Sequence, residues 1–139
     1  MAYYFGHWSE GKRHGEGQYC MADATVYQGT WVDDKLHGQG SCHKVNGTSY
    51  EGEWLNHQHH GKGKKTFPDK SSYVGSFING KKHGHGVLKC PDGGVYDGQF
   101  ANDLINGQGV YTWLRWYPIH GQRSADNKKH GYGRLAFNL

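Results

Sequence analysis

The sequence lacks the features that mark membrane-spanning and secreted chains. No apolar run approaches the roughly 20 residues that a membrane-spanning helix needs, and the segment after Met1 has no basic region followed by an apolar one. The three cysteines, Cys20, Cys42 and Cys90, are odd in number and far apart, so neither a disulfide framework nor a CxxC metal or redox site is indicated. We therefore expect a soluble cytoplasmic protein whose cysteines pack in the reduced form.

Aliphatic residues are also scarce. Hydrophobic residues make up 35% of the 139 positions and 23 positions are glycine, which is poor material for a conventional globular core. The ten tyrosines, five tryptophans and five phenylalanines must therefore supply most of the packing. The net charge of +4 is modest and does not predict a nucleic-acid binder.

A tyrosine recurs every 23 residues and defines an internal repeat. Counting from this tyrosine as position zero, a glycine stands at position two, an aromatic residue at position four, and a His-Gly-x-Gly motif begins at position ten, with asparagine replacing histidine in the fifth copy. The aromatic residues at positions zero and four are Tyr4, Trp8, Tyr27, Trp31, Tyr50, Trp54, Tyr73, Phe77, Tyr96 and Phe100. We predict repeats at 4–26, 27–49, 50–72, 73–95 and 96–118 and a degenerate sixth repeat or cap at 119–139, which together form one domain over residues 1–139.

Each repeat has the pattern of a β-hairpin. Positions zero, two and four alternate with polar residues, as in a strand with one apolar face. A turn such as Asn79-Gly80 follows, then a second strand that ends near position seventeen, then a second turn built on Asp or Asn. The prediction is an all-β fold: an elongated, single-layer antiparallel meander in which tyrosine and tryptophan rings fill the space that the glycines leave on one face.

These motifs resemble the MORN (membrane occupation and recognition nexus) repeat. The resemblance covers Tyr4 to Gly109, and segments 11–17 and 80–86 carry the Gly-Lys-x-His-Gly-x-Gly signature. Similar repeats occur in radial spoke head proteins of cilia, junctophilins, plant phosphatidylinositol phosphate kinases, alsin and some SET-domain lysine methyltransferases, so the family alone does not fix a function.

Segments 51–61 and 101–104 look most like the radial spoke branch. The resemblance then implies a scaffold for protein–protein interaction in a cytoskeletal assembly, within a cilium or axoneme. Two alternatives stay open: a peripheral binder of anionic, phosphoinositide-containing membranes, and an accessory domain of a larger enzyme.

No catalytic or cofactor site is predicted. The histidines at position ten (His14, His37, His60 and His83) lie two strand spacings apart, about 9.6 Å, which is too far for two of them to share a zinc ion. His57, His59 and His60 lack a convergent third ligand, and no nucleophile stands beside a base. We expect a protein without enzymatic activity, metal or cofactor.

Two groups of residues are candidates for binding. A basic row at positions eight and nine would serve the membrane alternative; it consists of Lys12, Arg13, Lys35, Lys81 and Lys82, although acidic residues lie beside it. In the apolar stretch 112–120, Trp113, Trp116 and Tyr117 are the candidates for protein binding. We favour packing that caps the sheet end for Trp113 and Leu114, and contact with a partner, or with a second copy through the open sheet edge, for Trp116 and Tyr117.

Overall fold

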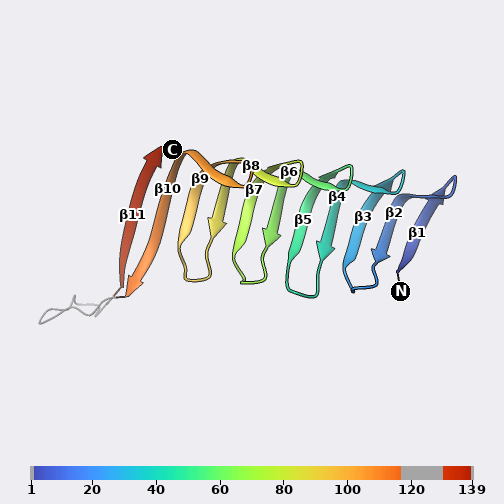
Figure 1. The fold of residues 1–139 in the computed structure, drawn as a ribbon, viewed down its shortest axis with the longest axis horizontal. Coiled ribbons are helices and arrows are strands. Elements are labelled where there is room, and N and C mark those ends of the chain that lie inside the picture. The colour runs from blue at the N-terminus through green and yellow to red at the C-terminus, as the bar shows by residue number, and fades with distance from the viewer. Residues whose placement is uncertain (1, 117–129, 139) are drawn as a thin grey trace, which may run out of the picture.

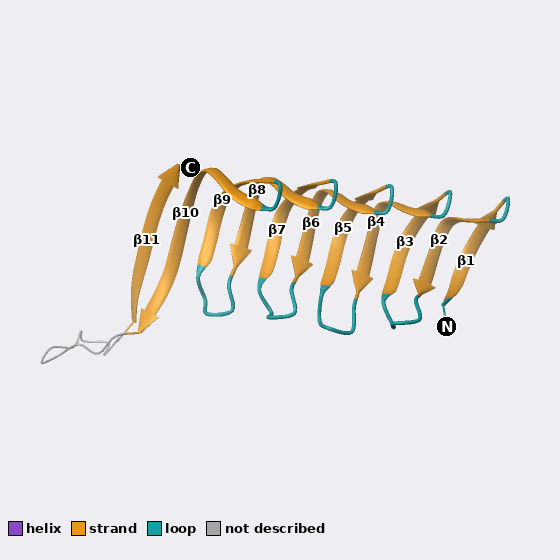
Figure 2. Ribbon diagram, in the orientation of Figure 1, coloured by secondary structure: helices purple, strands orange, loops and turns teal. Residues whose placement is uncertain are grey.

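The computed structural model describes residues 2–116 and 130–138, which form a single antiparallel sheet with no helix (Figure 1). Each strand pairs with its neighbours in sequence, so the sheet is an open, elongated meander one layer thick (Figure 2). The strands are β1 (Tyr3–Ser9), β2 (Lys12–Cys20), β3 (Val26–Val32), β4 (Lys35–His43), β5 (Ser49–Leu55), β6 (Gln58–Thr66), β7 (Ser72–Ile78), β8 (Lys81–Lys89), β9 (Val95–Ala101), β10 (Leu104–Trp116) and β11 (His130–Asn138). The predicted fold class is confirmed.

Two kinds of turn join the strands, and both were predicted. At one end of the sheet, two-residue turns close the hairpins; Asn79 and Gly80 have φ angles of 51° and 81°, the positive values that a type I′ turn requires. At the other end, an Asp or Asn carboxyl or amide oxygen accepts a hydrogen bond from the backbone two residues on, as from Thr25 to Asp23 at 2.9 Å. The equivalent acceptors are Asn46, Asp69 and Asp92.

The first glycine of each His-Gly-x-Gly motif forms a β-bulge. In the second repeat Gly29 pairs with Gly40 whereas Trp31 pairs with Leu36, so residues 37–39 lie opposite a single residue. Gly38 takes a φ of 79°, in the left-handed region that glycine enters at little cost. The same register shift recurs in the other four repeats, and the strands curve near their two-residue turns (Figure 2).

The second glycine of the motif makes room for a tyrosine ring. A Cβ built on Gly63 would lie 2.3 Å from the Tyr50 hydroxyl oxygen, so this ring covers the pair of glycines that Gly63 forms with Gly52. The Tyr50 hydroxyl then donates a hydrogen bond to the Glu53 carbonyl at 2.7 Å. Tyr4, Tyr73 and Tyr96 are placed in the same way. Tyrosine rings therefore fill the space that the missing glycine side chains leave, as the sequence predicts.

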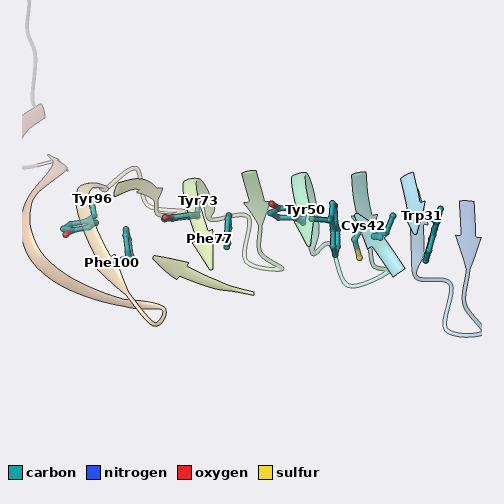
Figure 3. Close-up of a cluster of buried hydrophobic side chains, with 9 residues drawn as sticks. Trp31, Cys42, Tyr50, Tyr73, Phe77, Tyr96 and Phe100 are labelled. Atoms are coloured by element: carbon teal, nitrogen blue, oxygen red, sulfur yellow. The ribbon is translucent and has the colours of Figure 1, made fainter. Parts of the chain in front are cut away.

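The position-four aromatics complete a continuous row of buried rings along the sheet (Figure 3). Phe77 packs edge-on against the tyrosine of its own repeat, Tyr73, at 5.1 Å and against Tyr50 of the preceding repeat at 5.2 Å. Because each ring bridges two repeats, the core is a line of nearest-neighbour contacts rather than a compact centre.

The hairpin tips are also tied to one another. The backbone N–H at position seven donates to the carbonyl at position nine of the preceding repeat, as from Asp34 to Arg13 at 3.0 Å. The Asp34 carboxylate in turn accepts a hydrogen bond from the Arg13 N–H at 2.8 Å, and Asp103 does the same for Lys82. These contacts bring the position-nine side chains onto the aromatic rings.

The end of the fifth repeat differs from its prediction. The second strand does not stop near position seventeen: β10 continues to Trp116 and pairs with β11 along its length, from Gln108 opposite Asn138 to Trp116 opposite His130. Arg115, between Leu114 and Trp116, stands at the position of the Asp or Asn of the turn in the other repeats, and without that turn signal the strand continues. Most of the predicted sixth repeat or cap before β11 lies outside the described residues.

Candidate functional site

Two adjoining cavities open on the aromatic face beside the first three repeats. The larger, about 300 Å³, is lined by Arg13, Tyr19, Met21, Tyr27, Asp34, Lys35 and His57. The smaller, about 120 Å³, is lined by Tyr27, Cys42, Lys44, Thr48, Ser49, Tyr50, Trp54, His57, His59 and Lys65. Tyr27 and His57 belong to both cavities, so we treat them as one groove and call it the Tyr27 groove.

The groove arises from a local departure in the second repeat. Leu36, at position nine, is fully buried, and Leu36 and Trp54 are the side chains nearest to the glycine pair that a tyrosine ring covers elsewhere. Tyr27 instead packs against His57 with ring centroids 4.8 Å apart, and it stays half-buried. In this repeat the buried Leu36 occupies the space that a tyrosine ring takes elsewhere, and the Tyr27 ring becomes a wall of the groove. An aliphatic residue at position nine does not suffice, because Ile105 in the fifth repeat is 38% exposed and Tyr96 there still covers its glycine pair.

The lining of the smaller cavity includes two lysines, Lys44 and Lys65. Burial lowers the pKa of Lys65, and the nearby ammonium groups of Lys82 and Lys44 lower it further, while Asp103 opposes them. Lys82 lies 3.7 Å from the Asp103 carboxylate, but within residues 2–113 neither Lys44 nor Lys65 forms an ion pair. Two ammonium groups thus line the groove with no carboxylate within ion-pair distance in that range, although Lys44 is near enough to Asp23 to contribute to the lowered pKa of that carboxyl.

Two buried polar atoms of groove-lining residues have no hydrogen-bond partner among the described residues: Trp54 Nε1 and His59 Nδ1. The His59 ring stacks on Tyr50 with centroids 3.7 Å apart and planes 2° from parallel. Burial, followed by the charges of Lys65 and Lys44, lowers the pKa of His59 to about 4, so this ring is neutral at pH 7. The groove therefore offers cations at its mouth and unsatisfied ring nitrogens within.

The opposite face is polar and carries charges of both signs. His85 and Asp97 lie 2.9 Å apart there, both largely exposed, and Glu53 accepts a hydrogen bond from the Lys62 N–H at 2.6 Å. A hollow of about 620 Å³ over the last repeats is larger than the Tyr27 groove, but it is shallow and contains no aromatic ring of Phe, Tyr or Trp; its lining residues are His85, Asp97, Gly98, Gln99, Gln108, Gly109, Val110 and Ala136. The aromatic face is thus the better candidate for recognition.

The MORN repeat family model matches residues 4–26, 27–49, 50–72, 73–95, 96–113 and 125–138. The chain belongs to the MORN repeat family. The first four matched segments have the bounds expected from the tyrosine period, and the matches cover most of the chain. A search of curated proteins found no match.

The ten aromatic positions of the MORN repeats all lie on one face, but they are not equally covered. Trp31, Trp54, Phe77 and Phe100 are at most 4% exposed, whereas Trp8 is 58% exposed. The sequence predicts that Trp8 belongs to the same aromatic face as the others. It does lie on that face, but it is not buried as they are. In the structure no repeat lies before β1 to supply the second tyrosine that covers the other rings.

The predicted basic row does not form a continuous strip. Arg13 lies over the rings of Tyr19 and Trp31, at 4.3 and 4.8 Å from their centroids, and its Nε lies 3.1 Å from Asp34. Lys82 lies over Phe67 and is paired with Asp103. Lys12, Lys35 and Lys81 remain exposed. Neighbouring residues on a strand point to opposite faces, and so positions eight and nine cannot act together.

The histidines occupy several different environments. His14 and His37 are exposed, and the Nδ1 of His60 is buried without a partner. His57 and His59, considered above as metal candidates, both pack on the Trp54 ring, at 6.1 and 4.8 Å. Among the described residues no group of three or more His, Cys, Asp or Glu side chains is arranged to hold a metal ion.

The structure describes only some of the C-terminal residues that were predicted to cap the sheet or contact a partner. Trp113 is half-buried in β10 with its ring 5.8 Å from that of Tyr111, so it packs within the sheet. Trp116 is the last residue of β10, and Tyr117 lies outside the described residues. The partner contact predicted for these two residues stays a prediction. Within the described ranges there is also no helix long and apolar enough to cross a membrane.

Sequence reasoning missed Lys44 and Lys65 as functional candidates. A partial signal was present, because position nine is Leu36 in the second repeat and Arg13, His59 and Lys82 in the first, third and fourth, although Ile105 in the fifth repeat is also aliphatic. The sequence did not indicate the consequence of Leu36, which is a displaced tyrosine ring in β3, three strands from Lys65 in β6.

Proposed function

We propose that this MORN protein is a non-catalytic scaffold whose Tyr27 groove holds an acidic and partly apolar segment of a partner protein. The observation that carries the proposal is the pair of lysines, Lys44 and Lys65, that face a groove lined by aromatic rings and lack carboxylate partners in the described chain. MORN repeats form a module that is generally non-enzymatic, consistent with a role in binding.

The chemistry of the partner follows from the lining. A partner carboxylate between Lys44 and Lys65 would offset their mutual repulsion, and charge-assisted hydrogen bonds of this kind are roughly twice as strong as neutral ones. An apolar side chain suits the adjoining 300 Å³ cavity, whose walls include Tyr19, Met21 and Tyr27. An acidic side chain two to four residues from an apolar one would satisfy both cavities.

A membrane-binding role is also consistent with the family. We favour the scaffold because Arg13 and Lys82, two members of the basic row, are held on aromatic rings by Asp34 and Asp103 and do not face outward with the other three. Flotation of the protein with phosphoinositide vesicles at physiological salt should therefore show weak binding. Tight, headgroup-specific binding would reverse this ranking.

The groove is tested with peptide arrays in which Asp or Glu residues are combined with Leu and Phe, compared with arrays in which Lys replaces the acids. We expect retention of the acidic, apolar peptides and a loss of affinity as salt rises. The double variant Lys44→Glu with Lys65→Glu should lose at least about tenfold in affinity, equivalent to about 1.4 kcal/mol.

Lys64→Glu is the matched control for this experiment. Lys64 adjoins Lys65 in β6 but lies opposite Glu51 on the polar face, so its reversal changes the net charge without altering the groove. If Lys64→Glu weakens the acidic peptides as much as the double variant does, binding reflects overall charge and the groove is not the site.

The place of this scaffold in the cell is a further part of the proposal. The similarity of segments 51–61 and 101–104 to the radial spoke branch supports a partner in a ciliary or axonemal cytoskeletal assembly. Proximity labelling from the protein in ciliated cells, with Lys44→Glu, Lys65→Glu as the negative control, tests it: enrichment of axonemal proteins that is lost in the variant supports the assignment, and enrichment of membrane or enzyme complexes alone opposes it.

A further inference from the structure

The N-terminal edge strand β1 differs from every other first strand of a repeat. In the described sheet it pairs on one side only, with β2, and its residues, Tyr3 to Ser9, include no charged side chain, a feature that it shares with the interior strands β3 and β7. Natural sheet edges are commonly protected by charged residues, proline or a bulge that faces the edge. The bulge in this hairpin lies on β2, since residues 14–16 oppose His7. The outer edge of β1 is therefore regular and unprotected.

This strand also carries aromatic residues where the other repeats do not. On the polar face, Tyr3 and Phe5 are 52% and 68% exposed and pack against each other at 5.3 Å. The residues at the position of Phe5 in the next four repeats are Gln28, Glu51, Val74 and Asp97. Exposed aromatics on both faces of a strand with a free edge form an apolar patch of the kind that marks an interaction site.

On the aromatic face, Trp8 lacks one specific contact. Phe77 and Phe100 each lie between two tyrosines, those of their own and of the preceding repeat. Within residues 2–116 and 130–138, Trp8 contacts Tyr4 of its own repeat at 5.0 Å and no second tyrosine ring. The occupant of the β1 edge should therefore bring a tyrosine to Trp8.

We propose that this occupant is a second copy of the chain, bound by antiparallel pairing of the two β1 strands about a two-fold axis perpendicular to the sheet. Such an axis leaves both aromatic faces on the same side and continues the sheet through the interface. When the register is centred on Gly6, the partner's Tyr4 lies directly opposite Trp8, and Trp8 lies opposite the partner's Tyr4. Directly opposed residues of an antiparallel pair have Cβ atoms about 4.5–5.5 Å apart, so each tryptophan gains the second tyrosine.

Self-complementarity favours a copy of this chain over an unrelated strand. In the same register Phe5 lies opposite the partner's His7, which pairs an exposed aromatic ring with an exposed imidazole on the polar face. A two-fold arrangement makes each of these pairs twice and closes on itself, so it gives a dimer and not a fibre. The dimer does not involve the Tyr27 groove, and it would place two such grooves in one continuous sheet.

The register is tested by two double variants that differ at one residue. Phe5→Lys with His7→Lys places lysine opposite lysine twice, whereas Phe5→Lys with His7→Glu places lysine opposite glutamate twice. Both variants alter exposed side chains of β1 and remove the same aromatic pair. Like charges directly opposite one another destabilise a strand pair, and opposite charges stabilise it.

Sedimentation velocity over a concentration series measures the outcome. We expect the wild-type chain to form a dimer, the Lys/Lys variant to raise the dimer dissociation constant by at least about tenfold, and the Lys/Glu variant to recover most of the loss. Far-UV circular dichroism checks that all three chains keep their strand content. Binding of acidic peptides to the groove should be equal in all three, which separates failure of the dimer from failure of the groove.

Three results would overturn the proposal. A wild-type chain that remains monomeric up to its solubility limit rules out the dimer. Association that is unchanged in the Lys/Lys variant shows that copies meet through another surface. A folded Lys/Glu variant that associates no better than Lys/Lys shows that residues 5 and 7 do not face each other.

Discussion

The first and third repeats have almost the same sequence pattern, but the position-four tryptophan of the first is exposed to solvent and that of the third is buried. Tyr50 and Trp54 are 1% and 4% exposed, while their counterparts Trp8 and Tyr4 lie at an edge, with Trp8 58% exposed. Both repeats form the same hairpin, with a two-residue turn, a bulge and a tyrosine hydroxyl bonded to a backbone carbonyl. The difference shows that the residues of a repeat determine its own backbone, whereas the burial of its position-four ring also depends on the tyrosine of the repeat before it, as Trp54 packs against Tyr27.

The largest test of this comparison replaces a tryptophan at position four. Trp31→Ala should lower the free energy of unfolding by about 3–5 kcal/mol, because its ring is fully buried and its Nε1 donates to the Gly17 carbonyl at 3.0 Å. Trp8→Ala removes the same atoms from an exposed site and should cost under about 1 kcal/mol. Urea unfolding of both variants, at a protein concentration where the chain is monomeric, measures the difference. Equal losses would show that the first repeat is as well supported as the second.

A smaller difference between the first and third repeats lies in how their contributions to stability depend on pH. The residue at position nine is His59 in the third repeat and Arg13 in the first. The pKa of His59 is lowered to about 4, so the unfolded chain, in which a histidine titrates near 6.5, takes up a proton that the folded chain does not. The stability that the neutral His59 ring contributes is thus fully present above pH 6.5. As the pH falls from 6.5 towards 4, the free energy of unfolding decreases by about 2–3 kcal/mol.

Replacing His59 separates its contribution to the pH dependence from that of other groups. His59→Phe keeps a flat ring on Tyr50 and removes the titration, so the variant should lose less stability than the wild type between pH 7 and pH 4.5, as measured by thermal unfolding. His37→Phe, at an exposed site in the neighbouring repeat, is the control. A wild-type pH dependence in the His59→Phe protein would assign the effect to other groups, among which His57 also has a pKa lowered by burial.

The backbone was predictable because each of its features has a local sequence cause. The alternation of apolar and polar residues predicted the strands, and Asn79-Gly80 and its equivalents predicted the tight turns. The recurring glycines predicted the space in which the aromatic rings lie. The Tyr27 groove was not predictable from these rules, because it depends on how Leu36 and Trp54 of different repeats fill one glycine pair. The length of β10 was missed for a related reason: its last residues pair with β11, as in Trp116 opposite His130, and no local sequence pattern encodes this contact.

The smallest test concerns the glycines under the tyrosine rings. Gly63 and Gly17 occupy position thirteen in the third and first repeats, and a Cβ on either would overlap a tyrosine ring, at 2.3 Å from the Tyr50 hydroxyl oxygen and at 2.0 Å from that of Tyr4. Neither glycine has a positive φ in the left-handed region, so replacement by alanine tests packing and not backbone strain.

The surroundings of the two rings decide which substitution costs more. Tyr50 is enclosed by Trp54, His59 and Phe77, so in Gly63→Ala the ring cannot move without disturbing them, and we expect a loss of about 1–2 kcal/mol. Tyr4 is half-exposed beside the free edge and can swing outward, so Gly17→Ala should cost less despite the closer overlap. Differential scanning calorimetry of the two alanine variants provides the comparison. If Gly17→Ala proves the more damaging, the edge ring is as firmly held as the interior one, and β1 is covered in solution by a partner strand even at low concentration.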